Sequence, residues 1–188
     1  MTGMPPTPSQ TVGPYFALEL PRMERHELIA PSDPGAIRVR GIVFDGEGTP
    51  VNDALIELWQ ANRAGRYAHP EDTREEIPLE DGFEGWGRAS TDDGGHYEFI
   101  TVKPGQVPAP GGGMQAPHVE VAVFARGVMV RLATRIYFPD EAEANAADTV
   151  LASVPEDMRE RLVAVREDGG LRFDIHLQGD HETPFFAV

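Results

Sequence analysis

The chain has 188 residues, which is long enough for one domain with a hydrophobic core, and it carries 31 acidic against 16 basic residues, a formal net charge of −15. Such a surface repels phosphate backbones, so we expect no nucleic-acid partner. The absence of cysteine excludes disulfides and thiolate metal sites, and the lack of a signal peptide or long apolar run predicts a cytoplasmic protein without membrane contact.

The first 35 residues predict an extended N-terminal arm, with a short turn of helix near Pro21–Arg25. They contain seven prolines and no sustained periodicity. The segment is nevertheless too apolar for a solvated tail, because it includes Val12, Tyr15, Phe16 and Leu18. We therefore expect residues 1–35 to pack on a partner and residues 36–188 to form a single domain.

The remainder of the chain predicts strands, because apolar residues alternate with polar ones. The predicted strands cover residues 36–43, 54–60, 86–91, 96–102, 119–124, 128–138 and 171–177. The Asp92–Gly95 turn favours a β-hairpin of residues 86–91 with 96–102. Short helices are expected at 139–147 and 155–165, the second with Met158, Leu162 and Val165 on one face. This order predicts a mainly β fold, an antiparallel β-sandwich.

One predicted strand carries two polar residues at a metal-binding spacing. His118 and Glu120 are two residues apart, so both side chains project from the same face of the strand. The spacing leaves open a metal site, the remnant of one, or a core strand with two polar residues.

Several longer motifs resemble one known family. They are Thr7–Phe16 (TPSQTVGPYF), Leu58–Asn62 (LWQAN) with Gly65–Tyr67 (GRY), Thr101–Gly105 (TVKPG), Ala116–His118 (APH), Thr134–Phe138 (TRIYF) and Leu171–Asp174 (LRFD). In their order and spacing they resemble the intradiol ring-cleavage dioxygenases, along nearly the whole chain. The resemblance implies a transthyretin-like β-sandwich and oxidative cleavage of a catechol ring.

The resemblance also implies where a ferric ion would be bound in the catalytic members, by two tyrosines and two histidines. The matching positions here are Tyr67, Val107, His118 and Glu120, so one tyrosine and one histidine are replaced. Valine has no donor atom, and a lost phenolate weakens the preference for Fe(III). We interpret the four as vestigial metal positions, with no metal in this chain, where Glu120 accepts from the imidazole or a nearby arginine.

The pattern is similar to the α subunits of family members built from paired, related α and β subunits. That resemblance implies that Fe(III) is bound by a β-subunit partner, that this chain alone is inactive, and that the complex cleaves protocatechuate with O2 to 3-carboxy-cis,cis-muconate. It also implies substrate-pocket residues at the subunit interface. In this chain these are Thr11, Gly13, Pro14 and Tyr15 of the arm, together with Arg126, whose guanidinium suits a ring carboxylate.

Two other functions remain open at the level of the sequence. One is a stand-alone β-sandwich module that binds a small ligand in the pocket at the vestigial metal positions. The other is a self-contained metalloenzyme that uses Tyr67, His118 and Glu120, since carboxylate is also a hard ligand. The other histidines have no ligand spacing with a third partner. Four of them are expected at the surface: His26, His69, His96 and His181.

Overall fold

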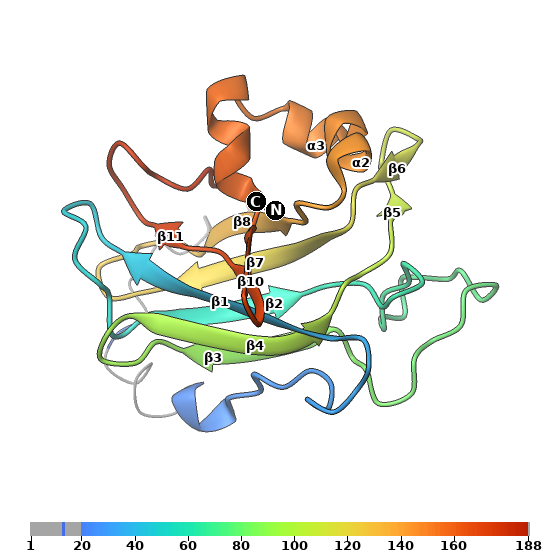
Figure 1. The fold of residues 1–188 in the computed structure, drawn as a ribbon, viewed down its shortest axis with the longest axis horizontal. Helices are drawn as coiled ribbons and strands as arrows, with labels where there is room; N and C mark the ends of the chain where they lie inside the picture. The colour runs from blue at the N-terminus through green and yellow to red at the C-terminus, as the bar shows by residue number, and fades with distance from the viewer. Residues whose placement is uncertain (1–12, 14–19, 188) are drawn as a thin grey trace, which may run out of the picture.

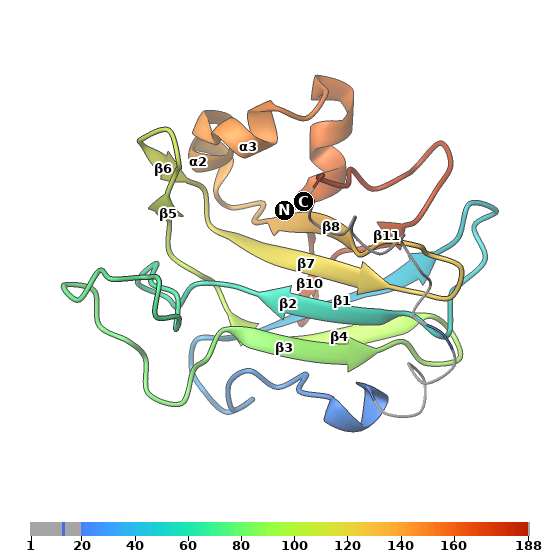
Figure 2. The ribbon, with the colours of Figure 1, turned by 180° about the vertical axis from the view of Figure 1, so that it is seen from behind.

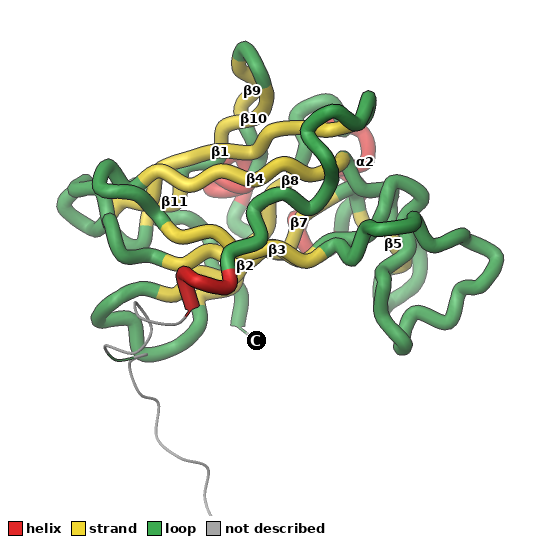
Figure 3. The backbone as a smooth tube through the Cα atoms, turned by 90° about the horizontal axis from the view of Figure 1, so that it is seen from below, coloured by secondary structure: helices red, strands yellow, loops and turns green. Residues whose placement is uncertain are grey.

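The computed structural model describes Gly13 and residues 20–187. Its strands form two sheets that pack face to face, as the two layers of strands in Figure 3 show. A short 3-10 helix, η1 (Leu20–Met23), precedes the strands and confirms the predicted helical turn. The mainly β sandwich predicted from the sequence is confirmed.

The first sheet is built around the long strand β1 (Ala36–Phe44). On one side β1 pairs antiparallel with β4 (His96–Val102), and on the other it pairs parallel with two short strands in succession, β10 (Gly170–Arg172) and β11 (Ile175–His176). β10 in turn pairs with β9 (Val165–Glu167). The predicted antiparallel sandwich is thus confirmed, with two short parallel pairings added where the chain returns beside β1 in the same direction.

The second sheet is antiparallel, in the order β3-β2-β7-β8. Its strands are β2 (Leu55–Trp59), β3 (Trp86–Ser90), β7 (His118–Phe124) and β8 (Leu132–Tyr137). A separate two-stranded ribbon joins β5 (Val107–Pro108) to β6 (Met114–Gln115), next to the start of β7 (Figure 1).

The main core lies between the two sheets and follows from the alternation along each strand. In β7, Val119, Val121 and Val123 face inward with at most 2% of their surface exposed. The intervening residues of β7 therefore face the outer side of the second sheet. This alternation places His118 and Glu120 on that outer face, away from the core.

The predicted hairpin of residues 86–91 with 96–102 is wrong. β3 pairs with β2, whereas β4 pairs with β1, so the Asp92–Gly95 turn carries the chain from one sheet to the other. The turn itself forms as expected, since the Asp92 carboxylate accepts hydrogen bonds from the backbone of Gly94 and His96. Local turn chemistry is the same whether the flanking strands pair or separate.

A helical segment covers one end of the outer face, over β8 (Figure 2). It consists of α2 (Ala142–Ala147), α3 (Thr149–Ala152) and η2 (Glu156–Leu162). Leu162 and Tyr137 belong to a second, smaller core cluster beneath it, with Met158 packed against the cluster. Val165 does not share this face, contrary to the prediction, because η2 ends at Leu162 and Val165 lies exposed in β9.

Residues 24–29 lead from η1 into the domain and pack on it. Leu28 is almost fully buried in the main core, and its backbone N–H donates to Ile100 O. Whether the residues before this segment contact a partner stays a prediction. Within the described part of the chain, no helix has the length and apolar character to span a membrane.

Candidate functional site: a broken metal cluster and a distant arginine

Two of the predicted positions, Tyr67 and Val107, come together because two loops meet closely. Gly65 has a φ of +83°, and a Cβ at this position would lie 2.1 Å from Gln106 O. Because glycine lacks that Cβ, the loop after β2 can approach the chain just before β5 this closely, and Gly105 N–H donates to Asn62 O. Tyr67 and Val107 consequently line one open pocket of about 450 Å³, together with Trp59 and Gln115.

His118 is fixed by its own strand. It is 3% exposed, and its Nδ1 lies 2.7 Å from Ala116 O, so this nitrogen donates to the carbonyl. The other ring nitrogen, Nε2, is buried and has no hydrogen-bond partner among the described residues; it lies 3.4 Å from Glu120 Oε1. Histidine ligands to metals are commonly oriented in this way: one ring nitrogen donates to a backbone carbonyl, and the other is left facing the metal position.

The closest contact of Glu120 in the cluster is with Arg135. These residues are directly opposite each other in the β7–β8 ladder, and Arg135 Nη2 lies 2.6 Å from Glu120 Oε1. Arg135 Nη1 donates to Gln115 Oε1 at 2.8 Å. The Arg135 side chain is 13% exposed and that of Glu120 is 34% exposed. The arginine expected near Glu120 is therefore Arg135, and its guanidinium lies inside the cluster.

The charges of the cluster follow from these contacts. Burial opposes ionisation of Glu120, but the His118 ring and the Arg135 guanidinium outweigh it and hold the pKa of the carboxyl below its usual value. Burial also opposes the charge on Arg135, yet Glu120 raises the pKa of the guanidinium. Burial, assisted by the Glu120 charge, raises the pKa of Tyr67 to about 12. Near neutral pH the cluster thus holds a neutral phenol and a charged pair.

This cluster does not fit a ferric ion. Fe(III) requires anionic hard donors, but Val107 offers no donor atom, and the Arg135 guanidinium carries the positive charge that a metal would supply. Within the described residues, no group of three or more histidine, cysteine or acidic side chains is placed to bind a metal ion. The structure brings all four vestigial positions into one region but does not make them a metal site.

Arg126 lies apart from this cluster, in the turn between β7 and β8. It lies six positions along the chain from Glu120, a separation of at most roughly 20 Å for an extended chain. Its side chain is 81% exposed, and its Nε lies 2.7 Å from Asp53 Oδ2. It therefore has no part in any pocket formed with Tyr67 or His118. Among the predicted arm positions, Gly13 has a φ of +72°, whereas Thr11, Pro14 and Tyr15 lie outside the described residues.

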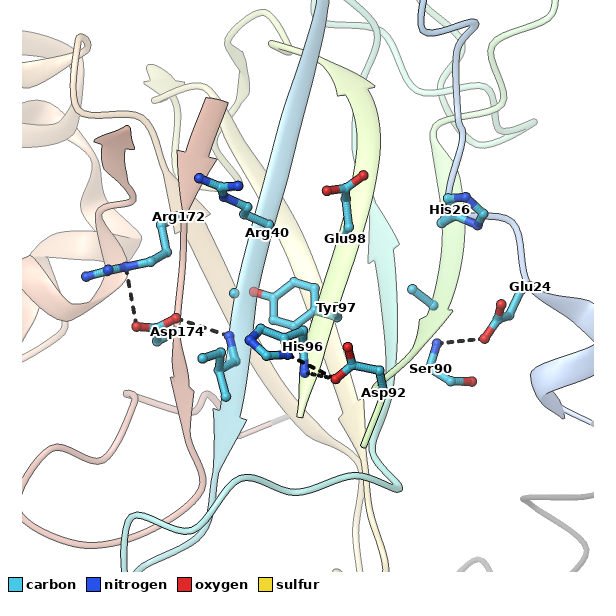
Figure 4. Close-up of a pocket in the computed structure, with 13 residues that line it drawn as sticks. Glu24, His26, Arg40, Ser90, Asp92, His96, Tyr97, Glu98, Arg172 and Asp174 are labelled. Atoms are coloured by element: carbon cyan, nitrogen blue, oxygen red, sulfur yellow. Dashed lines mark hydrogen bonds and ion pairs between the residues drawn. The ribbon is translucent and has the colours of Figure 1, made fainter. Parts of the chain in front are cut away.

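Another pocket, of about 630 Å³, opens beside β1 and β4 (Figure 4). None of the predicted site residues lines it. Its charged groups engage one another or the backbone: Arg172 pairs with Asp174 at 3.4 Å, His96 contacts Asp92 at 3.0 Å, and Glu24 accepts from Ser90 N. The remaining charged side chains of its lining are also engaged, since Arg40 pairs with Glu167 and Glu98 with Arg38, so we give this pocket no functional role.

Comparison with known proteins identifies the family. A sequence model described as "Dioxygenase" matches residues 12–179. The chain is 41% identical to the protocatechuate 3,4-dioxygenase alpha chain of Burkholderia cepacia, with both chains covered in full, and 42% identical to that of Pseudomonas putida, covering 97% of this chain and 96% of the relative. It is 39% identical to the Burkholderia cepacia beta chain, covering 79% of this chain and 66% of the relative.

Solved structures agree with this assignment. The dioxygenase domain of a dioxygenase–carbohydrate-binding fusion protein from Streptomyces sp. SirexAA-E superposes with a TM-score of 0.58 at 28% identity, covering 93% of this chain and 99% of that one. Catechol 1,2-dioxygenase from Acinetobacter sp. ADP1 shares the fold, with a TM-score of 0.60 at 23% identity; 80% of this chain matches 55% of that one. The chain belongs to the intradiol dioxygenase family, as its motifs predicted.

Proposed function

We propose that this chain is the metal-free α subunit of a protocatechuate 3,4-dioxygenase, and that it completes the active site of an iron-bearing β subunit. The observation that carries the proposal is the combination of full-length similarity to alpha chains with a donor set in which Val107 and the Glu120–Arg135 pair leave no place for iron. The β subunit supplies Fe(III), which activates the catechol for reaction with O2. Both oxygen atoms enter the product, 3-carboxy-cis,cis-muconate.

The residues of this chain would act on the substrate rather than on the metal. Protocatechuate carries a ring carboxylate, and a protein surface with a net charge of −15 repels it, so a local cation is needed. Arg126 meets this need, because it stays protonated and donates in a fork that matches a carboxylate. Its guanidinium contacts the carboxylate of Asp53, which a substrate carboxylate can replace.

The surroundings of Arg126 support a role at an interface. The same loop exposes Met129 and Val130, at 53% and 57% of their surface. Apolar side chains at the tip of a loop, next to an arginine, are typical of residues that become buried against another protein. Thr11, Gly13, Pro14 and Tyr15 of the arm would join Arg126 in lining the partner's pocket.

The two alternatives are less well supported. A self-contained metalloenzyme requires an ion close to the Arg135 guanidinium, and this conflicts with the positive charge already present in the cluster. A stand-alone binding module would leave the similarity to alpha chains over the full length without a reason.

Co-expression tests the proposal directly. The chain expressed alone should contain no stoichiometric iron and should not cleave protocatechuate. Co-expressed with a β-type chain that carries two tyrosines and two histidines at the ligand positions, it should form one complex. That complex should hold about one iron per α/β pair and show the red-brown colour of tyrosinate–Fe(III). Iron and ring cleavage in the isolated chain would overturn the proposal.

A further inference from the structure

The guanidinium of Arg135 lies among the residues that match the metal ligands of the family. We infer that Arg135 acts as an internal cation in place of the metal ion, and that it excludes iron from this position independently of the two replaced ligands. The inference concerns the fold of this chain alone, so it holds whether or not the chain works with a β subunit. It adds a third determinant, on a different strand, to the two changes visible at Val107 and Glu120.

The geometry of the arginine fork carries the first step. One arm of the fork, Nη2, lies 2.6 Å from Glu120 on β7, and the other, Nη1, donates to Gln115 on β6. Gln115 also pairs in register with Val107 on β5 and donates its side-chain N–H to Pro108 O. Arg135 therefore ties together both segments in which a ligand is missing, the β5–β6 ribbon and β7; the ribbon lies next to the start of β7 in Figures 1 and 2.

The second step is the position of the charge. A metal ion in such a site would neutralise the anionic donors around it, and the Arg135 guanidinium already does this for Glu120. The side chain of Arg135 is only 13% exposed, and it is fixed by partners on both arms of its fork. It cannot swing into solvent without breaking these contacts. A trivalent cation a few ångströms away would be repelled by a charge that the surrounding protein screens poorly.

The third step concerns the donors that remain. His118 Nε2 is buried and without a hydrogen-bond partner among the described residues, so one ligand atom is still presented. Tyr67 is stacked on Trp59 with ring centroids 5.7 Å apart, so the phenol is also held in place. Two family ligands are therefore still present and oriented. What opposes an ion here is the positive charge of Arg135 as well as the missing donors.

This inference makes a prediction that the loss of ligands alone does not make. Restoring the donor set with Val107→Tyr and Glu120→His should be insufficient, because Arg135 would remain and would also lose its carboxylate partner. Adding Arg135→Gln removes the charge but keeps an amide that can contact Gln115. Only this triple variant should bind iron.

The experiment compares the double variant (V107Y/E120H) with the triple variant (V107Y/E120H/R135Q) in the full chain, each incubated with ferrous iron in air and then desalted. We expect about one iron per chain and a visible tyrosinate–Fe(III) absorption band from the triple variant only, with at least tenfold less iron in the double variant. Equal iron in both overturns the inference. Iron in neither, in chains that still unfold cooperatively, also overturns it, because Arg135 would then not be what keeps the ion out.

A second measurement keeps the inference testable if the triple variant does not fold. Arg135→Gln and Glu120→Gln, each alone, should lower the melting temperature by several degrees, because each leaves one charge of the pair partly buried and unpaired. The double variant R135Q/E120Q should recover most of that loss, since it removes both charges. If the two single losses simply add in the double variant, Arg135 does not serve as the internal counter-charge and the inference fails.

Discussion

The substitution Arg126→Ala in the α/β complex separates a role in substrate binding from a role in folding. The Arg126 side chain is 81% exposed and its ion pair with Asp53 lies at the surface, so its loss should cost the fold at most about 1 kcal/mol. Assembly and iron content should therefore remain at wild-type levels. Any large loss of activity then reports on the active site.

The size of that loss follows from the chemistry of the contact. A charge-assisted hydrogen bond to a carboxylate contributes about 1.5–3 kcal/mol, which corresponds to a decrease of roughly ten- to a hundredfold in kcat/KM for protocatechuate. Catechol lacks the carboxylate, so its turnover should change by less than about twofold. Arg126→Lys keeps the charge but loses the fork, and it should give an intermediate value.

The assay is oxygen consumption with each substrate in turn, on complexes matched for iron content. Arg131→Ala is the matched control, because Arg131 is an exposed arginine of the same loop that has no proposed role. It should leave both substrates unaffected. If Arg126→Ala slows protocatechuate and catechol equally, or slows neither, the carboxylate role of Arg126 is wrong.

Three further substitutions test the fold that holds the site. Tyr97→Phe removes the buried hydroxyl that donates to Phe173 O, and urea unfolding should show a loss of about 1–3 kcal/mol with an unchanged m-value; an unshifted midpoint contradicts this. Gly41→Ala places a Cβ 1.8 Å from the same carbonyl, so its melting temperature should fall far below that of the control Gly111→Ala, where nothing lies within 4 Å. The hydrogen bond from Arg74 holds the pKa of Asp72 well below its usual value of 3.8. The stabilisation by the Asp72 carboxylate is therefore complete above about pH 4 and is lost as the pH falls below that value. Asp72→Asn should flatten the acid limb of the curve of stability against pH, and an acid limb identical to that of the wild type would refute this.

The strands could be predicted from the sequence because alternation reports which face of a strand is buried. Residues 96–102 were expected as a strand and form β4 with those bounds. Alternation does not report the neighbouring strand, and this is why the hairpin of β3 with β4 was predicted wrongly. The Asp92 carboxylate stabilises the turn through local hydrogen bonds that are satisfied whichever sheet the next strand joins.

The role of Arg135 could not be predicted because it depends on the register of β7 with β8. The sequence placed the turn at Ala125–Gly127 with the next strand starting at residue 128, which would pair Glu120 with Leu132. In the structure β8 begins only at Leu132, and Glu120 pairs with Arg135. The pairing of the two strands is thus shifted by three positions, and a shift by an odd number of residues moves Arg135 from the core face to the outer face. The sequence predicts that an arginine lies near Glu120, but it does not identify that residue as Arg135.

The two features on β7 lie far enough apart to act independently, as the proposed metal-free subunit requires. The cluster around Glu120 lies at the start of the strand, and Arg126 follows its end, at most roughly 20 Å away. Glu120 and Arg135 pair with each other at the cluster and still occupy opposite positions in the ladder between β7 and β8. The loop that presents Arg126 is held by that ladder and not by the cluster. Changes in this chain's own pocket therefore need not disturb what it contributes to a neighbour.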